Sequence, residues 1–218
     1  EKFHEASYND AKSQEPNGWH SFMSSTGSVA SMVSEPVHTY ESAEVRENAA
    51  EDNKKCVKIV STPVKFMGMV VASANGTITT GRLQAGSADA TSNKNCSFLD
   101  FTSTDVDANG DPFYAVLNNK PDAMKVWVKF KAGDGNKNPK ATISALLTNG
   151  EYAQDPEDDK YAANIIARAN NSSIESKDEW QEITIPFTYN NESEMPKAAL
   201  VTMSTCAVPS GGSKSETN

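Results

Sequence analysis

The three histidines of this 218-residue chain are the first residues whose side chains could bind a metal ion. His4, His20 and His38 lie within the first forty residues, but their spacing fits no standard pattern of zinc ligands. The sequence contains no GxSxG, no HExxH and no glycine-rich phosphate loop. Its 29 carboxylates identify no acid and base, because such a pair needs a cleft and a raised pKa. The motif search therefore favours no catalytic residue.

The run DVDANGD is the stretch that most resembles a metal site. The candidate Ca²⁺ ligands in it are Asp105, Asp107, Asn109 and Asp111. They match the first half of a calcium-binding loop, whose twelfth position should be a bidentate Glu or Asp. That position is Val116 here, and no helices are expected on either side. An Asx-rich turn between strands explains the run better, and no cofactor other than this Ca²⁺ ion is predicted.

The segment KVWVKF, which begins at Lys125, places a tryptophan among lysines. Side chains alternate in a strand, so Trp127 would share one face with Lys125 and Lys129 while the valines face the core. Sugars offer flat apolar C–H faces and many hydroxyls, so an exposed indole beside polar side chains suits carbohydrate binding. Alternatively, a long loop or the lysine stems cover the ring.

Trp180 lies on a comparable polar face, which it shares with Glu182. Trp19, near the start of the chain, is interpreted as a packing anchor. The predicted carbohydrate-binding residues are Trp127, Trp180, Lys125, Lys129 and Glu182.

Short segments rich in β-branched residues must position these side chains, and Gly, Pro, Asn and Asp separate them. They predict strands at 56–61, 64–72, 78–84, 97–101, 114–117, 124–132, 140–148, 164–169, 180–187 and 197–204. Alternation within 140–148 and 180–187 predicts one buried face and one mostly wet face. The fold class expected from these strands is all-β, a two-sheet antiparallel β-sandwich.

The segments between the strands are expected to be loops. Glu41 to Asp52 is either a short surface helix or a solvated loop, and its single sizeable apolar residue favours the loop. Residues 133–140 are expected to form a hairpin connection, and 149–160 a longer acidic loop. No linker and no repeat divides the chain. One domain is therefore predicted over residues 1–218, with an N-terminal arm at 1–20 and a flexible tail at 210–218.

The composition limits the partners of the chain. A net charge of -9 and a pI near 4.9 argue against binding to nucleic acid or to an anionic membrane surface. No apolar run approaches the roughly 20 residues that span a bilayer, so direct membrane insertion is not expected. The cysteines Cys56, Cys96 and Cys206 can form at most one disulfide and are interpreted as buried small hydrophobic residues. The chain begins at Glu1 without an export signal, and any such signal is expected to have been removed or not included.

Six segments, taken in this order, resemble those of the putative carbohydrate metabolism domain family. They are NGWHSF (17–22), TTGRL (79–83), GDPFYAVLNNKPDAMKVWVKFKAG (110–133), ATISALLTNG (141–150), EWQEITIPFTYNN (179–191) and MPKAALVTMSTCAVPSGGS (195–213). The most specific are the Gly-x-Pro-Phe segment that leads through Lys-Pro to a Lys-x-Trp-x-Lys-Phe strand, and the late Trp before Ile-x-Ile-Pro-Phe. The resemblance implies a jelly roll similar to carbohydrate-binding modules, galactose-binding-like, in secreted proteins and lipoproteins of gut bacteria. It supplies no catalytic residues.

The resemblance, the composition and the outward aromatic residues favour a non-catalytic carbohydrate-binding or carbohydrate-associated module of a bacterial surface protein. Its expected partner is a polysaccharide or oligosaccharide, and its expected location is extracellular, on the outer-membrane surface or in the periplasm. One alternative is a structural domain that contacts neighbouring surface proteins, because the family's last strand, with an apolar-Asp-Asp pattern, is missing and would leave a sheet edge open. The other alternative is a glycoside hydrolase, so the question of an enzyme stays open.

Overall fold

Strands make up nearly all of the regular structure in the computed structural model, which describes residues 2–8, 10–33, 39–50, 54–66, 69–89, 91–136 and 139–207. The strands are β1 (Phe3–Tyr8), β2 (Ala11–Pro16), β3 (Thr39–Ser42), β4 (Cys56–Ile59), β5 (Thr62–Phe66), β6 (Met69–Ala74), β7 (Thr77–Thr79), β8 (Arg82–Ala85), β9 (Asn95–Leu99), β10 (Ala115–Val116), β11 (Ala123–Val128), β12 (Lys140–Thr148), β13 (Ala153–Asp155), β14 (Ile165–Glu175), β15 (Gln181–Pro186), β16 (Thr188–Tyr189) and β17 (Ala198–Ser204). Short 3-10 helices are η1 (Phe22–Ser24), η2 (Ala30–Met32) and η4 (Asp159–Asn164). Among the described residues, no helix has the length and apolar character needed to cross a membrane.

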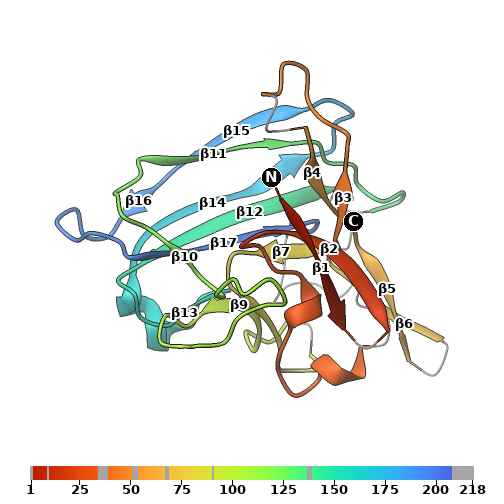
Figure 1. The fold of residues 1–218 in the computed structure, drawn as a ribbon, viewed down its shortest axis with the longest axis horizontal. Coiled ribbons are helices and arrows are strands. Elements are labelled where there is room, and N and C mark those ends of the chain that lie inside the picture. Colours follow the sequence, from red (N-terminus) through yellow and green to blue (C-terminus); the bar gives the residue numbers. More distant parts are fainter. Residues whose placement is uncertain are drawn as a thin grey trace.

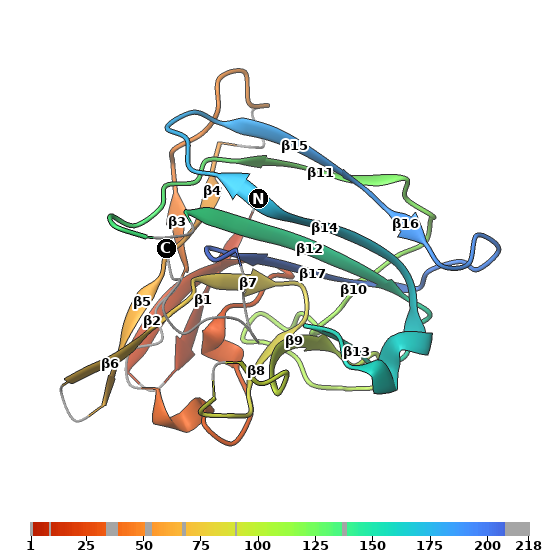
Figure 2. The same ribbon diagram turned by 180° about the vertical axis from the view of Figure 1, so that it is seen from behind.

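The largest sheet has the strand order β10–β17–β12–β14–β16, and β7 also pairs with β17. All of its pairs are antiparallel. β12 pairs with β14 along one edge and with β17 along the other, over almost its whole length. The three strands run side by side in both views of the molecule (Figures 1 and 2). β12 is therefore the centre of the fold.

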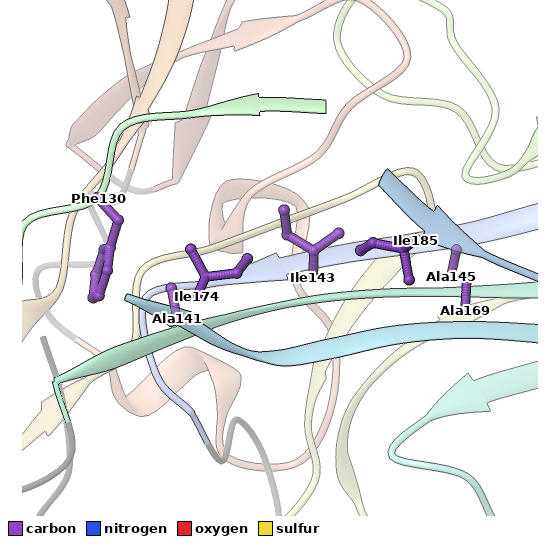
Figure 3. Packing of buried hydrophobic residues seen from close by; sticks show 7 residues of the cluster. All are labelled: Phe130, Ala141, Ile143, Ala145, Ala169, Ile174 and Ile185. Atoms are coloured by element: carbon purple, nitrogen blue, oxygen red, sulfur yellow. The ribbon is translucent and has the colours of Figure 1, made fainter. Parts of the chain in front are cut away.

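The pair β11–β15 packs against one face of this central sheet. A row of apolar side chains along β12 and β14 meets Phe130, which follows β11, and Ile185 of β15 (Figure 3). The buried members of this cluster are Phe130, Ala141, Ile143, Ala145, Ala169, Ile174 and Ile185. This contact confirms the expected all-β fold with two packed antiparallel layers.

The opposite face of β12 is buried as well. A second cluster joins Leu146 of β12 to Leu99 of β9 and Ala153 of β13, and the small sheet β13–β9–β8 lies over this side. The expectation of a mostly wet face on 140–148 is therefore wrong: Thr142 and Thr148 are buried. Their hydroxyls have partners, since Thr142 Oγ1 donates to the Ala207 carbonyl and Thr148 Oγ1 accepts from Gly150 N.

In β15 the expected alternation is confirmed, because Ile183 and Ile185 are more buried than Glu182 and Thr184. The single strand expected at 78–84 is instead two strands, β7 and β8, with a break at Gly81. A Cβ atom at Gly81 would lie 2.3 Å from the Phe98 carbonyl oxygen and 2.4 Å from Leu200 Cδ1. Gly81 therefore lies too close to β9 and β17 for any residue with a side chain, and the strand is interrupted at this position.

Several other segments differ from expectation. The single strand expected at 64–72 is instead two paired strands, β5 and β6, and 149–160 contains β13 and the start of η4. The connection at 133–140 is no hairpin, because β11 pairs with β15 while β12 pairs elsewhere. Residues 43–50 form the expected loop after β3. The expected N-terminal arm contains the paired strands β1 and β2. The expected tail at 210–218 lies outside the described residues, and so does His38.

We expect Leu147→Ala to lower the free energy of unfolding by about 2–5 kcal/mol, because the Leu147 side chain is fully buried where β12 contacts its neighbours. Val116→Ala is the matched control, since Val116 is 56 % exposed and should change stability by less than about 0.5 kcal/mol. Urea unfolding followed by fluorescence measures both values. Equal effects of the two substitutions would contradict the central position of β12.

Candidate functional site

The outer face of β11 carries the tryptophan that the sequence singled out. Lys125 and Trp127 are exposed, whereas Val126 and Val128 are half-buried and pack towards the cluster beneath them. Trp127 exposes 38 % of its surface. The alternation predicted for this strand is confirmed, and the indole stands on the outer face of the layer.

A cleft of about 1070 Å³ lies between β11, one end of the central sheet and the β3–β4 hairpin. All three tryptophans of the chain line it: Trp127 on β11, Trp180 just before β15, and Trp19 in the segment after β2. Trp19 and Trp180 are half-buried. The interpretation of Trp19 as only a packing anchor therefore missed its place in the cleft wall.

The loop at 43–50 covers part of Trp127. The Arg46 guanidinium carbon lies 4.6 Å from the centre of the indole ring, and the Glu44 carboxylate forms an ion pair with Lys129. This is the covering loop that the sequence offered as an alternative, with an arginine on the ring in place of lysine stems. Because the loop covers the ring only in part, Trp127 still faces the cleft.

The structure brings four of the five predicted carbohydrate-binding residues together. Lys125, Lys129 and Trp180 line the same cleft as Trp127. Glu182 lies opposite Trp127 in the β11–β15 register and pairs with Lys125 at 2.9 Å, but it is not part of the lining.

The cleft is richer in positive than in negative charge, although the whole chain carries a net charge of -9. Its basic lining residues are Arg46, Lys55, Lys58, Lys125, Lys129, Lys131 and Lys177, and its acidic ones are Glu44, Asp134 and Asp178. Lys58, Lys131 and Lys177 form no ion pair with any other described residue. The cleft is therefore a local basic region in an acidic protein.

The four predicted Ca²⁺ ligands bind protein groups of their own surroundings. Asp105 pairs with Arg82 at 3.0 Å, and Asp111 Oδ2 accepts hydrogen bonds from Gly18 N and Asn109 Nδ2. Asp107 Oδ1 accepts from the backbone N–H groups of Asn109 and Asp111, both at 2.8 Å. The run thus forms the Asx-type turn that the sequence also offered.

The other carboxylate oxygen of Asp107, Oδ2, faces a different group of side chains, which the sequence did not reveal. Among the described residues, His4, Glu15 and Asp107 form a group whose potential metal-binding atoms lie within 4.8 Å of one another. His20 also approaches Asp107. Burial raises the pKa of Glu15, against the effect of its hydrogen bond from Ser21, and burial lowers the pKa of His20. His4 and Glu15 are direct cross-strand partners in β1–β2, so prediction of that hairpin would have paired them.

The cysteines form no disulfide. Cys96 and Cys206 are buried, as expected, and burial raises the pKa of the Cys96 thiol to about 12. Cys56 is only half-buried and lines the cleft, where its Sγ donates to the Glu44 carbonyl at 3.0 Å. The prediction of a buried residue is therefore wrong for Cys56.

Comparison with known proteins agrees with this architecture. A solved structure described as a putative glycoside hydrolase from Bacteroides vulgatus has a TM-score of 0.60 at 15% identity, with 94% of this chain and 86% of that chain covered. A second, described as a putative glycoside hydrolase from Bacteroides thetaiotaomicron, has a TM-score of 0.48 at 16% identity, with 76% of this chain and 49% of that chain covered. No curated protein matches the sequence. Residues 1–206 match the family model described as the putative carbohydrate metabolism domain, and the chain belongs to that family.

Proposed function

We propose that this chain is a carbohydrate-binding module and that it holds an oligosaccharide in the cleft lined by its three tryptophans. The single observation that carries the proposal is the convergence of Trp19, Trp127 and Trp180 on one cleft. Ligand sites commonly have volumes of about 300–1,000 Å³, and the cleft reaches the upper end of that range. Indole rings beside polar side chains match the apolar faces and hydroxyls of a sugar.

The contacts around Trp127 support a binding role for this ring. Arg46 lies against the indole, and Glu44 of the same loop is paired with Lys129. These contacts restrain the ring before a ligand arrives, which reduces the entropy lost on binding. The exposed part of the ring remains available for stacking.

The charge of the cleft favours an acidic carbohydrate, which carries uronate or sulfate groups. The lining has more lysine and arginine residues than carboxylates, and Lys58, Lys131 and Lys177 are without an ion pair to other described residues. An anionic glycan would neutralise this local excess of positive charge. A neutral glycan would leave the excess of positive charge in the cleft unchanged.

Binding without catalysis agrees best with the carboxylates of the cleft. Glu44, Asp134 and Asp178 are exposed, whereas the acid of a glycoside hydrolase needs burial or a nearby charge that raises its pKa. The solved structure with a TM-score of 0.60, which is described as a putative glycoside hydrolase, makes hydrolysis the second candidate. Release of reducing sugar from a panel of polysaccharides would favour it over simple binding. Binding to neighbouring surface proteins without any glycan affinity would instead favour an interaction domain.

We expect Trp127→Ala to weaken glycan binding by about 10- to 30-fold, because the substitution removes the exposed stacking surface. A glycan array identifies the ligand, and isothermal titration calorimetry compares the variant with the wild type. Tyr40→Ala is the matched control, since Tyr40 is 40 % exposed, close to the 38 % of Trp127, and does not line the cleft. Unchanged affinity in Trp127→Ala would remove this ring from the binding site.

We expect the protein to bind an oligogalacturonate at least about 10-fold more tightly than the methyl ester of the same oligosaccharide, because esterification removes the negative charges. Lys177→Gln should reduce this difference in affinity between the acid and the ester, and added salt should reduce it further. Equal affinities for acid and ester in a titration would contradict the acidic ligand but would leave carbohydrate binding itself in place.

We expect one thiol of the native protein to react rapidly with a disulfide reagent, and this thiol is Cys56, because Cys96 and Cys206 are buried. A glycan that occupies the cleft should slow this reaction, since Cys56 is part of the lining. The rate at which the reagent releases its own thiol measures the reaction. Cys56→Ser should abolish the fast phase of this release. A bound glycan that leaves the rate unchanged would place its site outside this end of the cleft.

A further inference from the structure

Four buried polar side chains meet where the β1–β2 hairpin contacts the loop that contains Asp107. We call them the His4 cluster: His4 on β1, Glu15 on β2, His20 in the bridge to β7, and Asp107. Their side chains expose 9 %, 0 %, 0 % and 3 % of their surface, respectively. The cluster is separate from the tryptophan cleft, whose lining contains none of the four residues.

The facing atoms of the cluster lie close together without hydrogen bonds. His4 Nε2 is 3.2 Å from Asp107 Oδ2 and 3.6 Å from Glu15 Oε2, and His20 Nε2 is 3.3 Å from Asp107 Oδ2. None of these atoms has a hydrogen-bond partner among the described residues. Buried polar atoms nearly always have partners, so this group of unsatisfied atoms is a candidate binding site for a cation.

In His4, Glu15 and Asp107, the second polar atom of the side chain does have a partner. Asn17 Oδ1 lies 3.3 Å from His4 Nδ1, and Ser21 N donates to Glu15 Oε1 at 2.7 Å. Asp107 Oδ1 accepts two backbone N–H groups in its turn. In known metal sites, hydrogen bonds to the side-chain atoms that do not bind the metal orient the ligands in the same way. The inner atoms His4 Nε2, Glu15 Oε2 and Asp107 Oδ2 are thereby aimed at one another.

The contact of His4 Nδ1 with Asn17 Oδ1 matches the imidazole tautomer that carries a proton on Nδ1. A neutral imidazole that donates from Nδ1 to Asn17 presents a lone pair at Nε2. That lone pair would face the oxygens of two carboxylates, an arrangement that is unfavourable unless a proton or a metal ion lies between them.

We propose that His4, Glu15 and Asp107 bind a divalent transition-metal ion of the Zn²⁺ type, and that His20 stands beside Asp107 at the edge of this site. The spacing of the ligand atoms supports the proposal. In a tetrahedral site with bonds of 2.0–2.2 Å, neighbouring ligand atoms are about 3.3–3.6 Å apart. The two measured separations around His4 Nε2, 3.2 and 3.6 Å, agree with that geometry.

The ligand types distinguish this site from the candidate Ca²⁺ loop of the sequence. Ca²⁺ takes six to eight oxygen ligands, whereas the His4 cluster combines an imidazole nitrogen with two carboxylate oxygens. Mixed nitrogen and oxygen ligands suit Zn²⁺ and its neighbours in the transition series. Asp107 is the residue that the candidate Ca²⁺ loop and the His4 cluster share.

The test is calorimetric titration of the full chain with ZnCl₂ after treatment with a chelator. We expect one Zn²⁺ per chain with a Kd below about 10 µM, weaker binding of Mn²⁺, and no binding of Ca²⁺ or Mg²⁺. Saturating Zn²⁺ should also raise the melting temperature, because the ion binds only the folded arrangement. Co²⁺ should give the visible absorption bands of a tetrahedral site.

Glu15→Gln and Asp107→Asn keep the size of the side chains, and each should weaken Zn²⁺ binding by at least about 100-fold. Asn17→Ala, which removes a positioning residue, should weaken it by about 10- to 100-fold. Glu5→Gln is the matched control, because Glu5 is also on β1 but its side chain is 59 % exposed.

Absence of Zn²⁺ binding to the wild type at about 100 µM would overturn the proposal and leave protons to balance the cluster. Binding that survives both Glu15→Gln and Asp107→Asn would place the ion elsewhere. The wild-type titration decides the question even if a variant fails to fold, and neither result depends on glycan binding.

Discussion

The fold depends on β12 being enclosed on all sides. Its two edges pair with β14 and β17, and every residue after Lys140 is buried. A strand in this position can carry polar residues only if their hydroxyls find partners, and Thr142 and Thr148 do. The layer β11–β15 must then cover the Ile143 face, because that face is apolar. This requirement holds β11 in place, so that Trp127 lines the cleft together with the neighbouring residues Val126 and Val128.

The sequence predicted β11 well because the information is local. One face of the strand packs on the core and the other does not, so a period of two places Trp127, Lys125 and Lys129 without knowledge of any neighbour. The same reasoning failed for β12, since serine and threonine were taken as signs of a wet face. Whether such a face is exposed to solvent depends on a second sheet that is distant in sequence. The alternation of side chains within one strand contains no information on that sheet.

The sites required contacts that no local pattern contains. Trp19 and Arg46 reach the cleft from the N-terminal segment and from the loop after β3, so the sequence identified one wall and missed the others. The His4 cluster likewise joins a hairpin to a loop roughly a hundred residues later. The DVDANGD run did identify Asp107 as a ligand candidate, but its partners are residues from β1 and β2 and not the neighbouring carboxylates.

The two sites are connected through β2. Glu15 of this strand belongs to the His4 cluster, and the next residue, Pro16, lines the cleft together with Trp19. Two residues before Glu15, and on the same face of β2, buried Ser13 donates a hydrogen bond to the Thr39 carbonyl at 2.7 Å, which fixes β3 and therefore the β3–β4 wall. An ion in the cluster would hold the hairpin β1–β2 against the 105–111 turn. The shape of the cleft at Trp19 would then depend on that ion, because one short strand carries residues of both sites.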